Sequence, residues 1–139
     1  MKRISPGQQI FESSYWYVEH AYPTSLEGWL VIVLKRHCER LHELSLEEQL
    51  DLARVQYHVL QAIHQLFRSE REYVMCFAEA PGFKHIHFHV VPKHEEFEEA
   101  YKGGKVFHYL KAPTEEWVAP SRIQEICTHL HGRMIQTFS

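Results

Sequence analysis

Three histidines alternate with apolar residues in one short segment of the chain. They are His85, His87 and His89, within the sequence HIHFHV at 85–90. Successive side chains of a β-strand point to opposite faces, so a strand here places the three imidazoles on one face and the apolar groups on the other. Each buried imidazole needs a polar partner, and a purely structural strand has little use for three of them in register. The spacing therefore indicates a chemical site.

The chemistry that suits this pattern is nucleophilic and acid–base catalysis on phosphorus. A neutral imidazole is a good nucleophile near pH 7, and a neighbouring imidazolium can stabilise negative charge or protonate a leaving oxygen. Attack on phosphorus yields a labile phosphoramidate that water then cleaves, which divides one difficult displacement into two easier ones. A phosphate-containing substrate is therefore expected.

A metal site is the alternative, because imidazole is the commonest metal ligand. Alternate strand positions put the Cα atoms of His85 and His89 about 13 Å apart, whereas zinc–nitrogen bonds are about 2.0 to 2.1 Å long. All three histidines can hardly share one ion, although two of them could with ligands from elsewhere. The three cysteines, Cys38, Cys76 and Cys127, show no CxxC spacing, which argues against a zinc ribbon as well as a disulfide framework. We therefore expect no metal and no cofactor.

The elements that must position the histidines can be read from turns and periodicity. Alternation over 11–19 predicts a strand, and the apolar run WLVIVLK at 29–35 predicts a second strand, with a turn at 22–25 that makes them a β-hairpin. Residues 73–78 read as a third strand. Pro81 and Gly82 then return the chain into the histidine segment, 85–92, as an antiparallel pair of central strands.

A long amphipathic helix is predicted between these two pairs of strands. Ser45 and Glu48 form a capping box, and the pattern that follows predicts a helix over about 46–69. Its apolar stripe recurs at spacings of three and four: Leu46, Leu50, Ala53, Tyr57, Leu60, His64 and Phe67. A second set, Leu52, Val59, Ile63 and Leu66, widens that face, and a homodimer interface is one explanation.

The last third of the chain predicts an acidic loop and a final helix. Glu95, Glu96, Glu98 and Glu99 read as a solvated face, and Gly103-Gly104 should break any helix there. Pro120 can start a helix whose core residues recur at helical spacing: Ile123, Ile126, Cys127, Leu130 and Met134.

Composition bounds the class of protein. A chain of 139 residues with 45% hydrophobic residues is expected to form one domain, and a net charge of −3 offers no footprint for nucleic acid. The N-terminal segment has two early cations but no apolar run, so we expect no signal peptide, no membrane helix and a cytoplasmic location. Protonating all twelve histidines would raise the charge from −3 to +9, so acid should destabilise the fold.

The segment HIHFHVV at 85–91 resembles the histidine triad (HIT) pattern, His-x-His-x-His-x-x with apolar x. The resemblance is strongest over 15–93 and implies one HIT-like α+β domain over 1–139, with about five antiparallel strands, a long central helix and a C-terminal helix. It also implies a homodimer and a metal-independent nucleotide hydrolase or nucleotidyl transferase, which cleaves a phosphoanhydride or phosphoramidate at the α-phosphate.

The same resemblance implies roles for individual residues. His87 would be the nucleophile that becomes nucleotidylated, His85 would orient it, and His89 would bind phosphoryl oxygens or assist the leaving group. Four further residues are expected to contact a nucleotide-type substrate: His37 beside the triad, His20 at the ribose, Glu79, and the backbone of Gly82.

Two departures from the family pattern leave the substrate open. Trp29 stands where many relatives carry a histidine, and the turn at 80–84, APGFK, lacks the Gln-Ser or Gln-Thr that commonly precedes the triad. Lys84 and backbone amides around Gly82 could substitute in part. A weakly active nucleotide-binding or scaffolding protein is therefore an alternative to an enzyme, with a metal-binding protein third.

Overall fold

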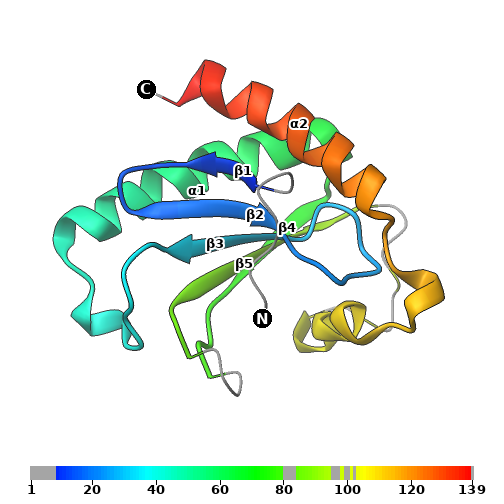
Figure 1. The fold of residues 1–139 in the computed structure, drawn as a ribbon, viewed down its shortest axis with the longest axis horizontal. Helices are drawn as coiled ribbons and strands as arrows, with labels where there is room; N and C mark the ends of the chain where they lie inside the picture. The colour runs from blue at the N-terminus through cyan, green and yellow to red at the C-terminus, as the bar shows by residue number, and fades with distance from the viewer. Residues whose placement is uncertain (1–8, 80–83, 95–97, 99–100, 102, 139) are drawn as a thin grey trace.

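A five-stranded antiparallel sheet forms the centre of the described part of the chain, in the order β1-β2-β3-β5-β4. The computed structural model describes residues 9–79, 84–94, 98, 101 and 103–138. The strands are β1 (Gln9–Glu12), β2 (Trp16–His20), β3 (Leu30–Leu34), β4 (Arg71–Met75) and β5 (His87–Lys93). Two long helices, α1 (Leu46–Phe67) and α2 (Pro120–Thr137), pack on one face of the sheet (Figure 1). The predicted α+β class is confirmed.

Two strands and a turn occupy 9–20, where the sequence predicts one strand over 11–19. β2 and β3 pair along their whole length, from Trp16 with Leu34 to His20 with Leu30, so the predicted hairpin is confirmed. The additional turn is held from α1: the carboxylate of Asp51 accepts from the Ser13 hydroxyl at 2.6 Å and from the Tyr15 N–H at 3.0 Å. Strand periodicity cannot reveal a turn whose anchor lies far away in the chain.

Helix α1 buries a different face from the one that its spacing predicts. The capping box is confirmed, because the Ser45 side chain accepts from the Glu48 N–H while the Glu48 carboxylate accepts from the Ser45 N–H. The core face, however, is Leu52, Val55, Val59 and Ile63, whereas Leu46, Leu50 and Tyr57 are 69%, 59% and 60% exposed. The apolar residues of α1 are distributed around much of its circumference, so its sequence contains two possible apolar stripes. Packing against the sheet decides which of the two is buried.

Buried charge on α1 also marks its inner side. Glu48 accepts two hydrogen bonds from the Arg36 guanidinium, at 2.7 and 3.0 Å, and this pairing lowers its pKa to about 2. A buried carboxylate is tolerated when it is paired and hydrogen-bonded. Arg36 follows the end of β3, so the ion pair attaches the start of α1 to the segment that leads toward His37.

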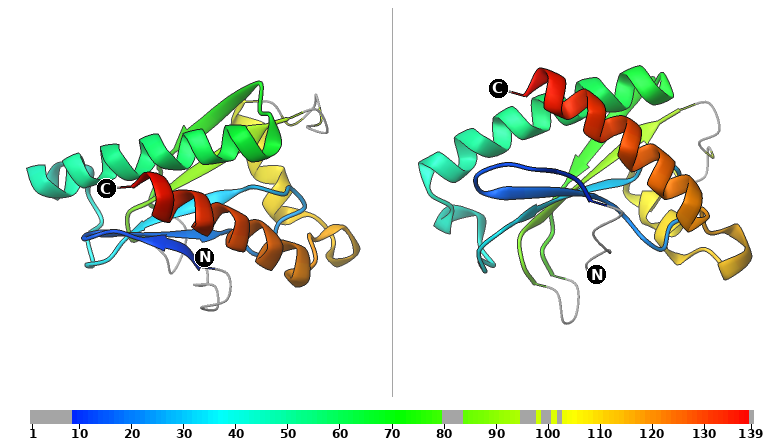
Figure 2. Two further views of the ribbon diagram at one scale, coloured as in Figure 1. Left: turned by 90° about the horizontal axis from the view of Figure 1, so that it is seen from above. Right: turned by 45° about the horizontal axis from the view of Figure 1, so that its top comes forward.

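Helix α2 begins at Pro120 as predicted and buries the five predicted residues, Ile123, Ile126, Cys127, Leu130 and Met134. Figure 2 shows α1 and α2 side by side over the sheet. The opposite face is covered by a 3-10 helix, η4 (Gly103–Lys111), which buries Val106 and Tyr109. The glycine pair thus starts a helix where a break is predicted. Of the acidic run, Glu98 is exposed, and 95, 96 and 99 lie outside the described residues.

The strands that carry the candidate site are shorter than predicted. β4 ends at Met75 rather than 78, and β5 begins at His87 rather than 85. β5 is central, between β3 and β4, whereas β4 is an edge strand instead of a second central one. Among the described helices, none combines the length and the apolar composition that a membrane span requires.

Candidate active site

His87 and His89 lie on strand β5, and both side chains are buried. They share the face of the sheet that η4 covers, opposite the face on which α1 and α2 pack, and their ring centroids are 4.9 Å apart. His85 lies just before the strand. The structure therefore brings the three histidines together, with two imidazoles in register and the third at the end of the strand.

The His87 ring has a defined orientation and tautomer. Its Nδ1 lies 2.7 Å from the carbonyl oxygen of His85. A carbonyl can only accept, so Nδ1 carries the hydrogen and Nε2 carries the lone pair of the neutral ring. Burial lowers the pKa of His87 below its ordinary value. At neutral pH the ring is therefore uncharged, which is the form that can act as a nucleophile.

His85 acts on His87 through its backbone, while its own ring is held by the chain around β3. The Cys38 N–H donates to His85 Nδ1 at 3.3 Å, so the hydrogen of the ring is on Nε2, which donates to the Leu34 carbonyl. The ring thus anchors the residue, and the His85 carbonyl sets the His87 tautomer.

His89 is enclosed by aromatic rings. The Trp29 Nε1–H donates to His89 Nδ1 at 3.0 Å, and the Phe107 ring packs edge-on with centroids 5.1 Å apart. Burial lowers the pKa of His89 to about 3. The sequence suggests imidazolium neighbours for the nucleophile, but His89 is neutral at physiological pH because its surroundings disfavour charge.

His20 lies in the core and not at the site. It is fully buried, its Nδ1 donates to the Ala21 carbonyl at 2.8 Å, and its Nε2 accepts from the Gly28 N–H at 3.0 Å. Both nitrogens therefore close the loop between β2 and β3. The ribose contact predicted for His20 does not fit this position.

Burial of His20 predicts acid sensitivity. Its pKa falls from 6.5 to about 4, chiefly through desolvation. The unfolded chain binds the proton more readily, so this contribution is complete above pH 6.5 and is lost as pH falls from 6.5 toward 4, roughly 3 kcal/mol in all. Urea unfolding at several pH values should show that the free energy of unfolding falls with decreasing pH over this range. This pH dependence should be smaller in His20→Gln, whose amide can still accept from Gly28. It should be unchanged in His42→Gln, which alters an exposed histidine. An equal slope in both variants would contradict the assignment.

Of the other predicted contacts, His37 lies against the triad, and Glu79 lies in a hollow that no triad histidine lines. His37 is exposed and stacks on the His85 ring, with centroids 5.6 Å apart and planes at 16°, and its Nε2 is paired with Glu39. Glu79 is exposed and lines a hollow of about 480 Å³ with Glu39, Arg40, Phe77, Ala78 and Lys84. Gly82 lies outside the described residues, as does the Pro81-Gly82 turn.

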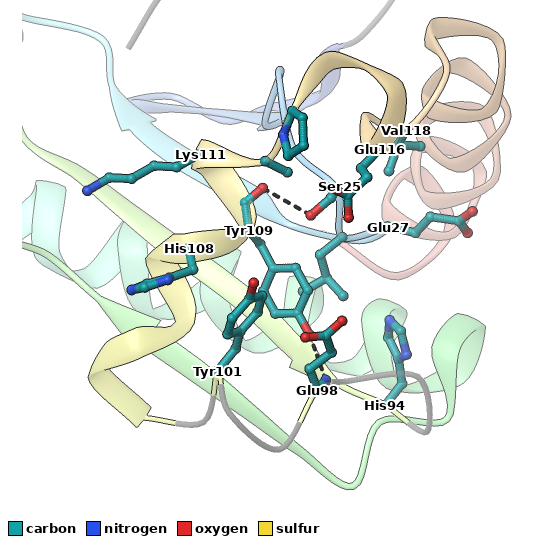
Figure 3. A pocket seen from close by; sticks show the side chains of 13 residues that line it. Ser25, Glu27, His94, Glu98, Tyr101, His108, Tyr109, Lys111, Glu116 and Val118 are labelled. Carbon is teal, nitrogen blue, oxygen red and sulfur yellow. Dashed lines mark hydrogen bonds between the residues drawn. The ribbon is translucent and has the colours of Figure 1, made fainter.

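A second hollow, of about 570 Å³, is lined in part by η4 (Figure 3). The loop that follows β2, the end of β5, η4 and the chain before α2 supply its lining, and no triad histidine takes part. The Tyr109 hydroxyl accepts from the Glu98 N–H at 2.7 Å, and the backbone carbonyl of Tyr109 accepts from the Ser25 hydroxyl at 3.3 Å. These bonds attach η4 to the loop after β2 and to the segment after β5, and so help to hold Phe107 over His89.

The sequence alone does not assign Trp29 and Phe107 to the site. Trp29 could be noticed only as a departure from the family pattern, and its place in an apolar run indicates core packing. Phe107 gave no signal, because two glycines precede the segment that carries it. Within the described ranges, no cluster of three or more histidine, cysteine or acidic side chains could hold a metal ion.

Solved structures share this fold. The chain superposes with a TM-score of 0.72 on the diadenosine triphosphate hydrolase of Plasmodium falciparum, at 13% identity, over 98% of this chain and 82% of that one. A histidine triad protein from Bradyrhizobium japonicum gives 0.74 at 13% identity, over 90% and 88%. A zinc-bound histidine triad family protein from Mycobacterium smegmatis gives 0.66 at 16% identity, over 95% and 86%.

Sequence comparison gives the family directly. No curated protein matches the chain. The HIT domain model, however, matches residues 3–96, about two thirds of the chain. That range contains the hairpin, the capped helix and all three histidines of the site. Because motif, fold and family model agree, the chain belongs to the histidine triad (HIT) family.

Proposed function

We propose that the protein is a nucleotide hydrolase or nucleotidyl transferase that acts at an α-phosphate through a nucleotidyl-His87 intermediate. The observation that carries the proposal is the hydrogen bond from His87 Nδ1 to the His85 carbonyl, which assigns the lone pair to Nε2. Family membership supports the substrate class. The Plasmodium relative is a diadenosine triphosphate hydrolase, so a dinucleoside polyphosphate is the first substrate to test.

The proposed reaction has two displacements. The Nε2 lone pair of His87 forms a bond to the α-phosphorus while the bond from phosphorus to its leaving atom breaks, and the leaving group takes that electron pair. Nδ1–H stays on the ring and keeps donating to the His85 carbonyl, which offsets the positive charge of the modified ring. Water, or another acceptor in a transferase, then attacks phosphorus, the P–N pair returns to Nε2, and the acceptor's proton passes to solvent.

A turnover screen tests this proposal. Diadenosine polyphosphates, adenosine phosphoramidates and sugar nucleotides would be incubated with untagged protein, with and without chelator. We expect turnover that survives chelation, and a protein quenched during turnover should gain the mass of one nucleoside monophosphate. Binding without turnover would favour the scaffold alternative. Loss of activity on removal of a stoichiometric transition metal would favour a metalloenzyme, for which the zinc-bound relative is the precedent.

We also propose that the protein is a homodimer that uses the outward stripe of α1. Leu46, Leu50 and Tyr57 lie on the side of α1 away from the sheet core, and large exposed apolar groups in one stripe are typical of interfaces. We expect sedimentation at micromolar concentration to give twice 16.6 kDa. Leu50→Glu with Tyr57→Glu should give monomer, whereas Gln124→Glu, an exposed polar change on α2, should not. A wild-type mass near 16.6 kDa would refute the dimer.

A further inference from the structure

The indole of Trp29 controls where the third histidine can carry a hydrogen. Trp29 is fully buried just before β3, and its Nε1–H donates to His89 Nδ1 at 3.0 Å. An indole nitrogen can donate but cannot accept. His89 Nδ1 must therefore hold a lone pair, and the hydrogen of the neutral ring must be on Nε2.

This hydrogen bond also opposes protonation of His89. A second hydrogen would have to go on Nδ1, where it would face the indole hydrogen, so an imidazolium at His89 requires the bond to Trp29 to break. The aromatic enclosure adds to this, since Phe107 packs on both His89 and Trp29, with centroids 5.1 and 5.6 Å apart. The low pKa of His89 agrees with this geometry. His89 can thus offer a hydrogen bond from Nε2, but it neither gains nor loses a proton easily.

The other groups of the site are no better placed to supply a proton. Both ring nitrogens of His85 are paired with backbone groups of Leu34 and Cys38. Nδ1–H of His87 is held by a carbonyl, and in the proposed reaction Nε2 of the same ring forms the bond to phosphorus. Cys76, which lies against the His87 backbone, has a pKa raised by burial. His37 stacks on the His85 ring, with centroids 5.6 Å apart, and its Nε2 is paired with the Glu39 carboxylate.

We propose that Trp29 is a specificity-determining residue: by fixing His89 as a neutral Nε2–H donor, it makes the site cleave P–O–P bonds and discriminate against P–N bonds. The inference rests on the function proposed above. When a P–O–P bond breaks, the oxygen leaves as a phosphate anion whose conjugate acid has a pKa of about 6, so no proton is needed. When a P–N bond breaks, the nitrogen leaves with the electron pair as a strongly basic amide anion unless it gains a proton first.

The first measurement compares two substrates that share one nucleoside, diadenosine triphosphate and adenosine 5′-phosphoramidate. At pH 7.5 we expect wild type to favour the anhydride by at least about 100-fold in kcat/KM. Trp29→Phe keeps an aromatic ring but removes the donor, and it should narrow the ratio by about tenfold or more, with the larger change below pH 6. Trp16→Phe is the matched control, because it makes the same substitution at a buried tryptophan whose indole donates to the Glu48 carbonyl on the opposite face of the sheet; the ratio should stay within about threefold.

The second measurement reads the tautomer directly. In nitrogen–proton correlation spectra, His89 of wild type and of Trp16→Phe should show hydrogen on Nε2 only and should remain neutral down to about pH 5. Trp29→Phe should show a mixture of tautomers or protonation within that range. A residue that merely fills space beside His89 would leave this signature unchanged.

The outcomes separate this inference from the proposed function. If wild type turns over both substrates at similar kcat/KM, the proposed function stands and the inference about Trp29 is overturned. A spectrum that shows hydrogen on His89 Nδ1 would also overturn the inference. If neither substrate is cleaved and no adduct forms, the proposed function fails. If Trp29→Phe does not fold, the wild-type ratio and the wild-type tautomer still decide, because each is fixed in advance.

Discussion

Replacing His87 with alanine is expected to abolish turnover while the protein stays folded. The variant loses the nitrogen that would bond to phosphorus, and neither neighbouring histidine can replace it. The His85 ring is held by backbone groups, and the lone pair of His89 is held by Trp29. Loss of a covalent nucleophile costs at least about a thousandfold in kcat, because the remaining groups can only bind and polarise the substrate.

The measurements for this variant separate chemistry from folding. Steady-state turnover and mass spectrometry of quenched protein should show no product and no nucleotidyl adduct in His87→Ala, and circular dichroism should match wild type. His129→Ala replaces an exposed histidine of α2 and should behave as wild type in both assays. Turnover near the wild-type rate in His87→Ala would remove this residue from the mechanism.

Replacing Gly28 with alanine is expected to be the most destabilising Gly→Ala change among the glycines that the structure describes. Gly28 has φ +88°, a conformation that side chains other than glycine rarely adopt. A Cβ atom there would lie 2.6 Å from Phe67 Cε2 and 2.9 Å from Pro92 Cγ. Backbone strain and overpacking together should lower the free energy of unfolding by about 3 kcal/mol.

The matched control for this change is Gly132→Ala in α2. Nothing lies within 4 Å of a Cβ at Gly132, and its backbone is helical. Alanine there should raise the free energy of unfolding by about 0.5 to 1 kcal/mol, because it reduces the freedom of the unfolded chain. The urea concentration at the unfolding midpoint should therefore be lower than wild type in Gly28→Ala and higher than wild type in Gly132→Ala. A Gly28→Ala variant within about 0.5 kcal/mol of wild type would contradict the close approach of α1 and β5 to this loop.

Local signals in the sequence were sufficient for much of the fold. The capping box at Ser45 and Glu48 starts α1, Pro120 starts α2, and the hairpin of β2 and β3 follows from apolar runs around a turn. Each depends on residues within a few positions of one another, so one sequence contains the whole signal. The alternation at 85–90 likewise indicates the face that His87 and His89 share, because strand geometry alone sets it.

Only the tertiary structure decided what depends on partners far apart in the chain. The same residue type, histidine, is a satisfied core group at position 20 and a candidate nucleophile at 87, because Gly28 and Ala21 use the nitrogens of one ring while the carbonyl of His85 orients the other. The face of α1 that is buried was decided in the same way, by the sheet on which it packs.

The state of His89 is the plainest example of this division. The sequence by itself determined that three imidazoles gather at one strand and that the chain belongs with the histidine triad proteins. It could not determine the tautomer or charge of His89, because these depend on Trp29, which lies just before β3, and on Phe107 in η4. Hydrogen-bond direction and burial set the protonation of an imidazole, and both are properties of the packed chain.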